Sequence, residues 1–144
     1  MRELFVDTSA WYPLVVRSAP GHASLGAAIR EHILSGSRIV TTSLVIAESH
    51  AMIMRRAGIE AGLAFLRRVR QPPTIVVEYT ADLEEEAIEQ WLGRYRDQRF
   101  SMTDAVSFAV MRRREIPEAL TLDAHFAIAG YAIVGGQGTR ALDA

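Results

Sequence analysis

Short apolar runs alternate along the chain with longer segments in which apolar residues recur every three or four positions. The short runs read as buried strands, and they cover residues 3–6, 38–41, 74–78, 119–122 and 131–134. The periodic segments read as helices with one buried face, and they cover residues 21–34, 43–56, 59–70, 80–96, 101–114 and 124–129. Strands that alternate with helices predict an α/β fold, in which a mostly parallel sheet is covered on both faces.

Glycine and proline mark the ends of several predicted helices. Gly58 separates helix 43–56 from the next helix, and Pro72-Pro73 follows that second helix before the third strand. The helix over 59–70 is expected to present Leu63, Leu66 and Val69 to the core. The segment 80–96 is expected to form one continuous helix.

The length of 144 residues is that of one domain of ordinary size. We predict a folded domain over residues 1–134 and a tail over 135–144, where glycines and polar residues replace the apolar period. No apolar run approaches the length of a membrane span, and the N-terminus has no signal-peptide pattern. We therefore expect a cytoplasmic protein that does not associate with membranes. The chain has no cysteine, which excludes disulfides, thiol nucleophiles and thiolate metal sites.

The basic residues are unusual in kind and in distribution. The formal net charge is −1, which by itself argues against a nucleic-acid partner, but all 16 basic residues are arginine and many are clustered. The clusters fall at residues 55–56, 67–70, 94–99 and 112–114. Arginines near helix C-termini offset the helix dipole, which is the first explanation for each cluster. The alternative is that some of them face the phosphates of a nucleic acid, because guanidinium groups bind phosphate oxygens bidentately.

Four carboxylates lie at the edges of apolar segments and carry the functional argument. Asp7 ends the first predicted strand and Asp123 closes the fourth, so both should lie at the edge of the sheet where ligands bind. Glu48 lies inside a helix among residues expected to be buried, where a cation would relieve the cost of an unpaired charge. Asp104 lies where the chain enters an apolar helix.

A group of acids without cysteine favours a hard divalent cation, Mg²⁺ or Mn²⁺. Zinc is disfavoured because the histidines are isolated and none forms a His-x-x-x-His pair. We expect these histidines to have surface or packing roles, and they are His22, His32, His50 and His125.

Helix capping is the structural alternative for three of the four acids. Asp7 and Asp123 each precede a helix, where an aspartate can accept a hydrogen bond from a free backbone N–H. Ser101 and Asp104 have the spacing of a capping box. Taken one at a time, each aspartate is as readily a cap as a metal ligand.

Together, the four acids and their neighbours resemble the ordered signature segments of the PIN-domain ribonucleases, particularly the VapC toxins of bacterial toxin–antitoxin pairs. The segments are Phe5-Val6-Asp7-Thr8-Ser9-Ala10, Thr42-Ser43-Leu44-Val45-Ile46-Ala47-Glu48, Ser101-Met102-Thr103-Asp104-Ala105 and Thr121-Leu122-Asp123-Ala124-His125-Phe126. The resemblance covers nearly the whole chain.

This resemblance implies a three-layer α/β/α sandwich and a Mg²⁺- or Mn²⁺-dependent endoribonuclease that cleaves RNA. It also implies a homodimer that is inhibited by a peptide segment of a cognate antitoxin. The implied metal-binding and catalytic residues are Asp7, Glu48, Asp104 and Asp123, with Ser9 and Thr103 as hydrogen-bonding neighbours. Among these acids, we place Asp7 and Asp104 as direct ligands, and the other two as direct or water-mediated ligands.

Two other functional classes share part of this pattern of acids. Phosphotransfer enzymes of the haloacid-dehalogenase type and receiver domains also place aspartates at strand ends, but they need a lysine, and the chain has none. A catalytically silent PIN-fold module that binds RNA or protein is the remaining alternative. The apolar residues that follow Asp7, from Trp11 to Val16, exceed what one short helix needs for packing, so we expect a partner to cover some of them.

Overall fold

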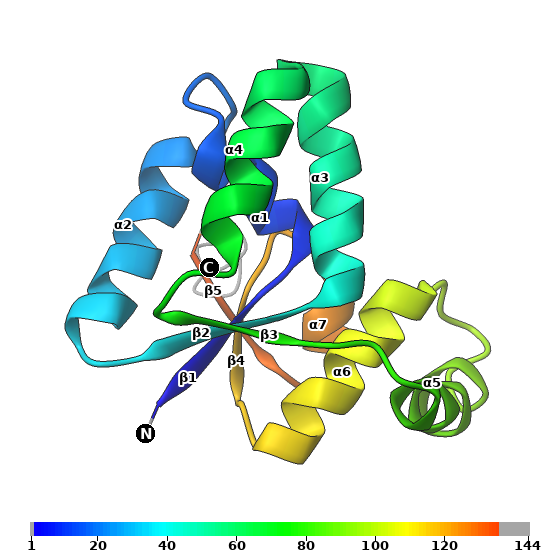
Figure 1. Cartoon of the computed structure of the whole chain (residues 1–144). Helices are drawn as coiled ribbons and strands as arrows, with labels where there is room; N and C mark the ends of the chain where they lie inside the picture. Colours follow the sequence, from blue (N-terminus) through cyan, green and yellow to red (C-terminus); the bar gives the residue numbers. More distant parts are fainter. Residues whose placement is uncertain (1, 136–144) are drawn as a thin grey trace.

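The computed structural model describes residues 2–135, and its elements follow the predicted order (Figure 1). The strands are β1 (Glu3–Val6), β2 (Arg38–Thr42), β3 (Thr74–Val77), β4 (Glu118–Leu120) and β5 (Ala132–Val134). The helices are α1 (Thr8–Val15), α2 (His22–Leu34), α3 (Ser43–Ala57), α4 (Ile59–Val69), α5 (Ala81–Ala87), α6 (Met102–Arg114) and α7 (His125–Ile128). A π-helical turn, η1 (Ile88–Leu92), follows α5. The predicted tail lies outside the described residues beyond Gly135.

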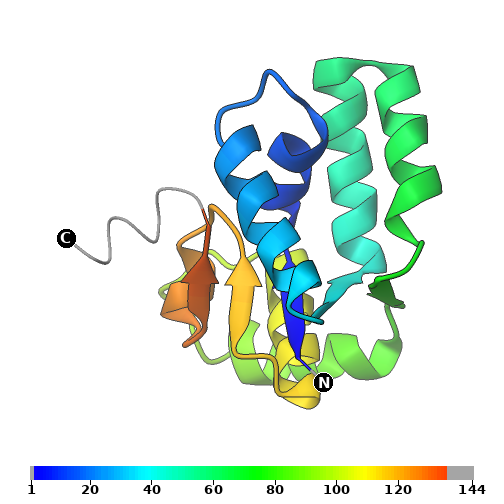
Figure 2. The same cartoon turned by 90° about the vertical axis from the view of Figure 1, so that its left-hand side faces the viewer.

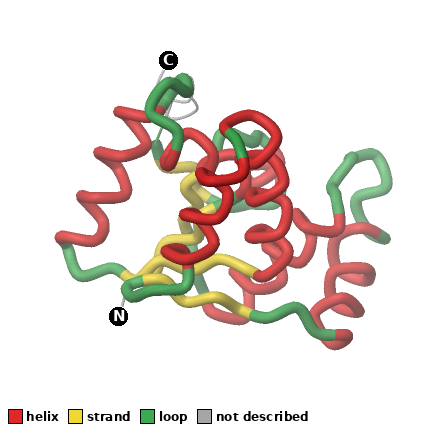
Figure 3. The backbone as a smooth tube through the Cα atoms, turned by 45° about the horizontal axis from the view of Figure 1, so that its top comes forward, coloured by secondary structure: helices red, strands yellow, loops and turns green. Residues whose placement is uncertain are grey.

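The strands form one sheet in the order β3-β2-β1-β4-β5, and every pairing is parallel. Helices α1 to α4 cover one face of this sheet, and α5 to α7 cover the other (Figures 1 and 2). The strands therefore lie between two helical layers, as the backbone trace also shows (Figure 3). The predicted three-layer α/β/α sandwich is confirmed.

The direction in which the sheet grows reverses between β1 and β4. From β1 the chain moves outward to β2 and β3, then returns past β1 to form β4 and β5. Ligands bind in such α/β sheets at the carboxyl ends of the strands that flank this reversal. Asp7 follows β1 directly at this position.

Helix α6 is buried along most of its length, with an unbroken run of buried residues from Thr103 to Met111. Phe108 lies at its centre and contacts Phe126 and Phe100 edge-on, with ring centroids 4.9 and 5.1 Å apart. Burying an aromatic side chain of this kind stabilises a fold by roughly 1.5–3 kcal/mol. The helix is therefore a firmly held platform for residues in its first turn, including Asp104.

The predicted helix over residues 80–96 is shorter in the structure. Its α-helical part ends at Ala87, and the wider turn η1 closes when the Gly93 N–H donates to the Ile88 carbonyl at 2.7 Å. A Cβ atom on Gly93 would lie 2.9 Å from that same carbonyl oxygen. The close approach explains why glycine stands at the end of this turn.

The predicted buried face of α4 was wrong at two positions. Leu63 and Leu66 are each 37% exposed, whereas Phe65 is buried, as is Val69, which was predicted correctly. The helix is rotated because it packs on α3 through Gly62, which is buried as well. None of the helices in the described residues is both long and apolar enough to cross a membrane.

Candidate active site

The end of β1 and the loop after β4 are joined by hydrogen bonds at Asp7. The Asp7 N–H donates to the Leu120 carbonyl at 3.2 Å, continuing the pairing of the two strands. Its carboxylate Oδ2 accepts the Ser9 N–H at 3.3 Å, which caps α1, and the Ser9 hydroxyl at 2.9 Å. The Thr121 hydroxyl also donates to this oxygen, at 3.0 Å. The three bonds fix the carboxylate through Oδ2.

Ser9 and Thr121 connect Asp7 to the segment that carries Asp123. Their hydroxyl oxygens lie 3.1 Å apart. Ser9 Oγ accepts the Leu122 N–H at 2.8 Å, and Thr121 Oγ1 accepts the Asp123 N–H at 2.9 Å. Ser9 was predicted as a neighbour of the site, but Thr121 was not. The signal was present in the sequence, because Thr121 is the hydroxyl residue between the last apolar residue of β4 and the acid.

Burial of the Asp7 carboxyl raises its pKa to about 6. Hydrogen bonds from Ser9, Thr121 and the Thr8 backbone lower this pKa, and the negative charge of Asp104 raises it further. The ionised form of Asp7 is thus only partly compensated by its protein neighbours. A cation beside it would remove the remaining penalty.

Glu48 lies near the start of α3 and is exposed, so the expectation that it would be buried was wrong. The first turns of α3 direct Val45 and Ile46 to the core and leave Glu48 on the open side. The Thr103 hydroxyl donates to its Oε2 at 2.5 Å, and the Thr8 hydroxyl donates to its Oε1 at 3.4 Å. Thr103 was predicted as a neighbour of the site and Thr8 was not. Both carboxylate oxygens of Glu48 are therefore held by threonines.

Asp104 lies in the first turn of α6 and is 8% exposed. The predicted capping box is present, since the Asp104 N–H donates to Ser101 Oγ at 3.0 Å and the Ser101 N–H donates to Asp104 Oδ2 at 3.1 Å. The same Oδ2 lies 3.1 Å from His125 Nδ1.

Asp123 lies in the loop after β4, three residues beyond the end of the strand. Its Oδ1 accepts the His125 N–H at 2.9 Å and lies 3.5 Å from His125 Nδ1. Ligand atoms of Asp104, Asp123 and His125 all lie within 4.8 Å of one another. The expectation of a surface or packing role for His125 did not include these carboxylate contacts, and its position two residues after Asp123 was the available signal.

The structure brings the four predicted acids to one end of the sheet but does not place them equally. Asp7 and Glu48 lie outside the group formed by Asp104, Asp123 and His125. Asp7 is linked to that group by the charge of Asp104 and by Thr121. Glu48 is linked to it through Thr103, the residue before Asp104.

The hydrogen bonds that the described residues make to Asp104 and Asp123 use one carboxylate oxygen of each aspartate. In Asp104 both donors reach Oδ2, and within the described chain no hydrogen bond reaches Oδ1. In Asp123 the backbone donor reaches Oδ1, and Oδ2 receives none from the described residues. Each side chain can therefore hold its loop or helix with one oxygen and offer the other to a cation. Carboxylate oxygens of this kind are the ligands that Mg²⁺ and Mn²⁺ prefer.

Three of the arginine clusters lie in the last turns of α3, α4 and α6, as the dipole explanation predicted. In α6, Arg113 pairs with Glu86 at 2.7 Å and Arg114 with Glu3 at 2.8 Å. The cluster over residues 94–99 differs, because it lies between η1 and α6 rather than in a regular helix. It leads into Phe100, whose ring meets the His125 ring edge-on at 5.2 Å. This segment therefore ends, at Phe100, beside a residue of the acidic group.

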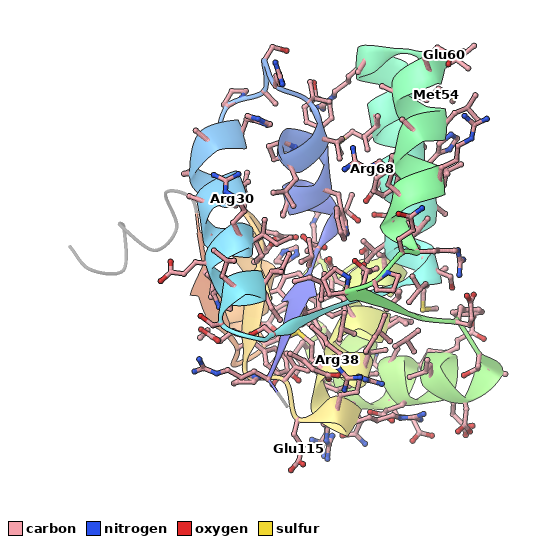
Figure 4. All side chains as sticks on the ribbon, turned by 60° about the vertical axis from the view of Figure 1, so that its left-hand side comes forward. Arg30, Arg38, Met54, Glu60, Arg68 and Glu115 are labelled. Carbon is pink, nitrogen blue, oxygen red and sulfur yellow. The ribbon has the colours of Figure 1, made fainter. Side chains whose placement is uncertain are left out.

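Away from the acids, a groove of about 430 Å³ lies between α1, α2 and α4. Its walls include Leu14, Val15 and Ile29, and Arg68 of α4 lies on the side toward α1 (Figure 4). Trp11 is 8% exposed and packs edge-on against Phe65, so the fold itself covers this residue of the apolar segment. Val15 is 43% exposed and remains open to the groove.

Comparisons with known proteins agree with this architecture. The family model of the PIN domain matches residues 4–130. The 23S rRNA-specific endonuclease VapC20 of Mycobacterium tuberculosis is 38% identical over 129 residues, which cover 89% of this chain and 95% of that protein. Ribonuclease VapC26 of the same organism is 28% identical over 137 residues, which cover 94% of this chain and 98% of that protein.

Two solved structures resemble this one. The crystal structure of M. tuberculosis VapC20, described as a Sarcin-Ricin loop cleaving toxin, has a TM-score of 0.81 and 33% identity, and the match covers 92% of this chain and 99% of that chain. The structure of FitAcB from Neisseria gonorrhoeae shares the fold, with a TM-score of 0.63 and 15% identity over 90% of this chain and 95% of that one. The family model and the similarity to VapC20 confirm the resemblance carried by the four acidic segments, and the chain belongs to the PIN domain family.

Proposed function

We propose that this protein is a metal-dependent endoribonuclease and the toxin of a type II toxin–antitoxin pair. The observation that carries the proposal is that Asp104 and Asp123, from different elements, lie together, and that one oxygen of each accepts no hydrogen bond from the described residues. Asp7 and Glu48 are linked to this pair through Thr121 and Thr103. RNA as the substrate is supported by the relatives, which are named as a 23S rRNA-specific endonuclease and a ribonuclease.

We assign the cofactor as Mg²⁺ or Mn²⁺. Bound at the acids, such a cation supplies Lewis-acid stabilisation of the phosphodiester and lowers the pKa of a coordinated water. Asp7 and Asp104 are the proposed direct ligands, and Asp123 contributes directly or through water. The two oxygens of Glu48 accept hydrogen bonds from threonine hydroxyls, which fix the orientation of its carboxylate. Its proposed role is to orient a water molecule. Hydrolysis by water leaves a 5′-phosphate and a 3′-hydroxyl.

The arginines at positions 94, 96 and 99 are the proposed contact for the RNA backbone. An acidic site repels phosphates, so binding needs positive charge close by as well as the cation. The other arginine cluster on this layer is partly neutralised, since Arg113 and Arg114 pair with glutamates. The segment between η1 and α6 is therefore the better placed of the two to bind phosphates.

The decisive test is RNA cleavage by the purified chain with Mn²⁺ or Mg²⁺ and with a chelator. We expect cleavage only with the cation, products that carry 5′-phosphates, and a rise in melting temperature on adding Mn²⁺. Cleavage that persists in the chelator, or that leaves cyclic phosphates, would show that a different chemistry operates. Wild-type protein that neither cleaves RNA nor gains stability from millimolar cation would contradict the assignment.

A catalytically silent PIN-fold module that binds RNA or protein is the second candidate. The observation in its favour is that Asp7, Asp104 and Asp123 all make local hydrogen bonds that a purely structural residue would also make. The raised pKa of Asp7 argues against this candidate. Burial beside another acid makes Asp7 costly to ionise, and a residue kept only for capping would bear that cost without the cation that offsets it.

The proposed partners are a cognate antitoxin and a second copy of the chain, both in the cytoplasm. The groove between α1, α2 and α4 is the proposed site for an apolar antitoxin segment, with Arg68 available to an acidic group of that segment. The apolar side chains of α4 that point away from the core offer a surface for the homodimer. They include Ile59, which is 66% exposed, and Leu63 and Leu66.

A further inference from the structure

His125 lies between two of the proposed metal-binding carboxylates, which come from different elements. Its Nδ1 is 3.1 Å from Asp104 Oδ2, at the start of α6, and 3.5 Å from Asp123 Oδ1, in the loop after β4. The two carboxylates carry like charges and repel each other when both are ionised. A donor placed between them offsets this repulsion in the absence of a metal.

The surroundings of the ring determine which nitrogen carries the hydrogen. Ionised carboxylates only accept hydrogen bonds, so the nitrogen that faces both of them, Nδ1, must donate. The ring is held in this orientation by Phe100, whose ring meets it edge-on at 5.2 Å. The backbone of His125 acts in the same direction, because its N–H donates to Asp123 Oδ1 at 2.9 Å. One residue thus binds Asp123 through its backbone and reaches Asp104 through its side chain.

This arrangement has a specific effect on Asp104. Oδ2 receives the His125 ring and the Ser101 N–H, each at 3.1 Å. With both donors on one oxygen, the carboxylate cannot rotate without losing two hydrogen bonds, and Oδ1 is held outward. The neighbours of a ligand that orient it in this way are a major part of how proteins tune metal sites.

We propose that His125 is a positioning residue of the metal site, which orients Asp104 and Asp123 through Nδ1–H. The inference rests on the proposed metal-dependent nuclease and adds a residue to it. It differs from two other roles for the same side chain. A packing residue would act only through its ring contact with Phe100, and a direct metal ligand would act through a nitrogen lone pair.

Three substitutions separate these roles. His125→Asn places an amide N–H close to the position of Nδ1, His125→Gln places one close to Nε2, and His125→Phe keeps the ring without a donor. The measurement is Mn²⁺ affinity of the full chain by titration calorimetry, together with RNA cleavage. We expect the Asn variant to stay close to wild type and the Gln and Phe variants to lose affinity by roughly tenfold to a hundredfold. His22→Phe is the matched control, because the His22 ring contacts the Pro13 carbonyl instead of a carboxylate.

The opposite pattern, with Gln retained and Asn impaired, would assign the role to Nε2 and overturn the proposal. Equal affinities in wild type and all three variants would overturn it as well, and affinity kept by Phe alone would indicate packing. If the Phe variant fails to fold, the comparison of Asn with Gln still decides.

A second measurement does not depend on the metal. The ¹⁵N chemical shifts of the His125 ring in metal-free protein report which nitrogen carries hydrogen, and we expect hydrogen on Nδ1. Hydrogen on Nε2 would contradict the proposal even if the protein is a nuclease. Wild-type protein that binds no Mn²⁺ but shows hydrogen on Nδ1 would instead count against the proposed function and leave the hydrogen bond in place.

Discussion

The hydroxyl of Thr121 donates a hydrogen bond to Asp7 Oδ2 at 3.0 Å, across 114 positions of the sequence. Thr121 has no exposed surface, and Asp7 is 3% exposed, so the bond is shielded from competing water. It ties the loop after β4 to the residue that ends β1. The orientation of one proposed ligand therefore depends on the segment that carries another, Asp123.

The first prediction separates capping from metal binding at Asp104. Asp104→Asn keeps an oxygen that can accept the Ser101 N–H but loses the charge that would hold a cation. We expect RNA cleavage to fall by orders of magnitude with little change in melting temperature or circular dichroism. Thr80→Ala is the control for a lost cap, because Thr80 caps α5 by accepting the Leu83 N–H at 3.2 Å. It should lower stability by about 0.5–2 kcal/mol and leave cleavage intact.

Normal RNA cleavage by the Asp104→Asn variant would show that Asp104 serves only as a helix cap. Loss of cleavage that merely follows unfolding of the variant would lead to the same conclusion, and the melting temperature distinguishes the two cases.

The second prediction concerns the stability of the metal-free protein. The pKa of Asp7 is about 6 in the folded state against 3.8 ordinarily, so the folded state binds more protons between these values. The free energy of unfolding should therefore fall by up to about 3 kcal/mol as pH rises from about 4 to about 6. Above that pH, Asp7 should cause no further loss. Asp7→Asn should remove much of this loss. Above about pH 6, urea unfolding in the presence of a chelator should show that the variant is more stable than wild type by on the order of 1 kcal/mol. A less stable variant at that pH would mean that the hydrogen bonds outweigh the buried charge.

The third prediction follows from the same pKa. A cation competes with the proton on Asp7, so the rise in melting temperature caused by Mn²⁺ should weaken as pH falls through about 6. It should be small in Asp7→Asn at every pH. Thermal melts at matched ionic strength measure both. A Mn²⁺ effect that is constant from acid to neutral pH would place the cation away from Asp7.

The fourth prediction tests the segment between η1 and α6. Replacing Arg94 and Arg99 by glutamine should weaken RNA binding and reduce the slope of log affinity against log salt by about 1–2. Arg113→Gln is the matched control, since this arginine is already paired with Glu86 at 2.7 Å. Binding is measured at several salt concentrations. Equal losses in the double variant and the control would show a general charge effect rather than a contact by this segment.

The fifth prediction concerns the contact between α3 and α4. A Cβ atom on Gly62 would lie 3.1 Å from His50 Cδ2, a tight contact that requires His50 to shift by a few tenths of an ångström. Gly62→Ala should therefore fail to give the gain of about 1 kcal/mol that alanine offers in a helix. In a His50→Ala background the gain should appear. Denaturant unfolding of wild type, the two single variants and the double variant gives the coupling energy between the two positions. Additive changes in the free energy of unfolding would mean that His50 moves aside without cost.

The elements could be predicted from the sequence because apolar period and chain breakers are local properties. For this reason the bounds of β1 and the N-cap of α6 at Ser101 are predicted correctly. The rotation of α4 could not be predicted, since it depends on how closely Gly62 approaches His50 on another helix. The exposure of Glu48 likewise depends on where α3 leaves the sheet.

The candidate site shows the same division. Acidic residues at strand ends and helix starts could be recognised with their neighbours Ser9 and Thr103. Thr121 and His125 were not recognised although they lie beside Asp123 in the sequence, because the bonds that make them important reach Asp7 and Asp104, which are distant in the sequence. Closeness to Asp123 was a local signal for both residues, but it does not say which distant side chain each of them bonds.

The pairing of β1 with β4 has a consequence for protein synthesis. Helices α1 to α4 and strands β1 to β3 all precede residue 78, so a nascent chain can pack one layer of the sandwich before the other half exists. Asp7 receives the Thr121 bond only after residue 121 has left the ribosome. A ribosome-bound fragment that stops short of β4 therefore carries Asp7, Glu48 and Asp104 without Asp123 and without the Thr121 bond, so the four proposed acids come together only when nearly the whole chain has been made.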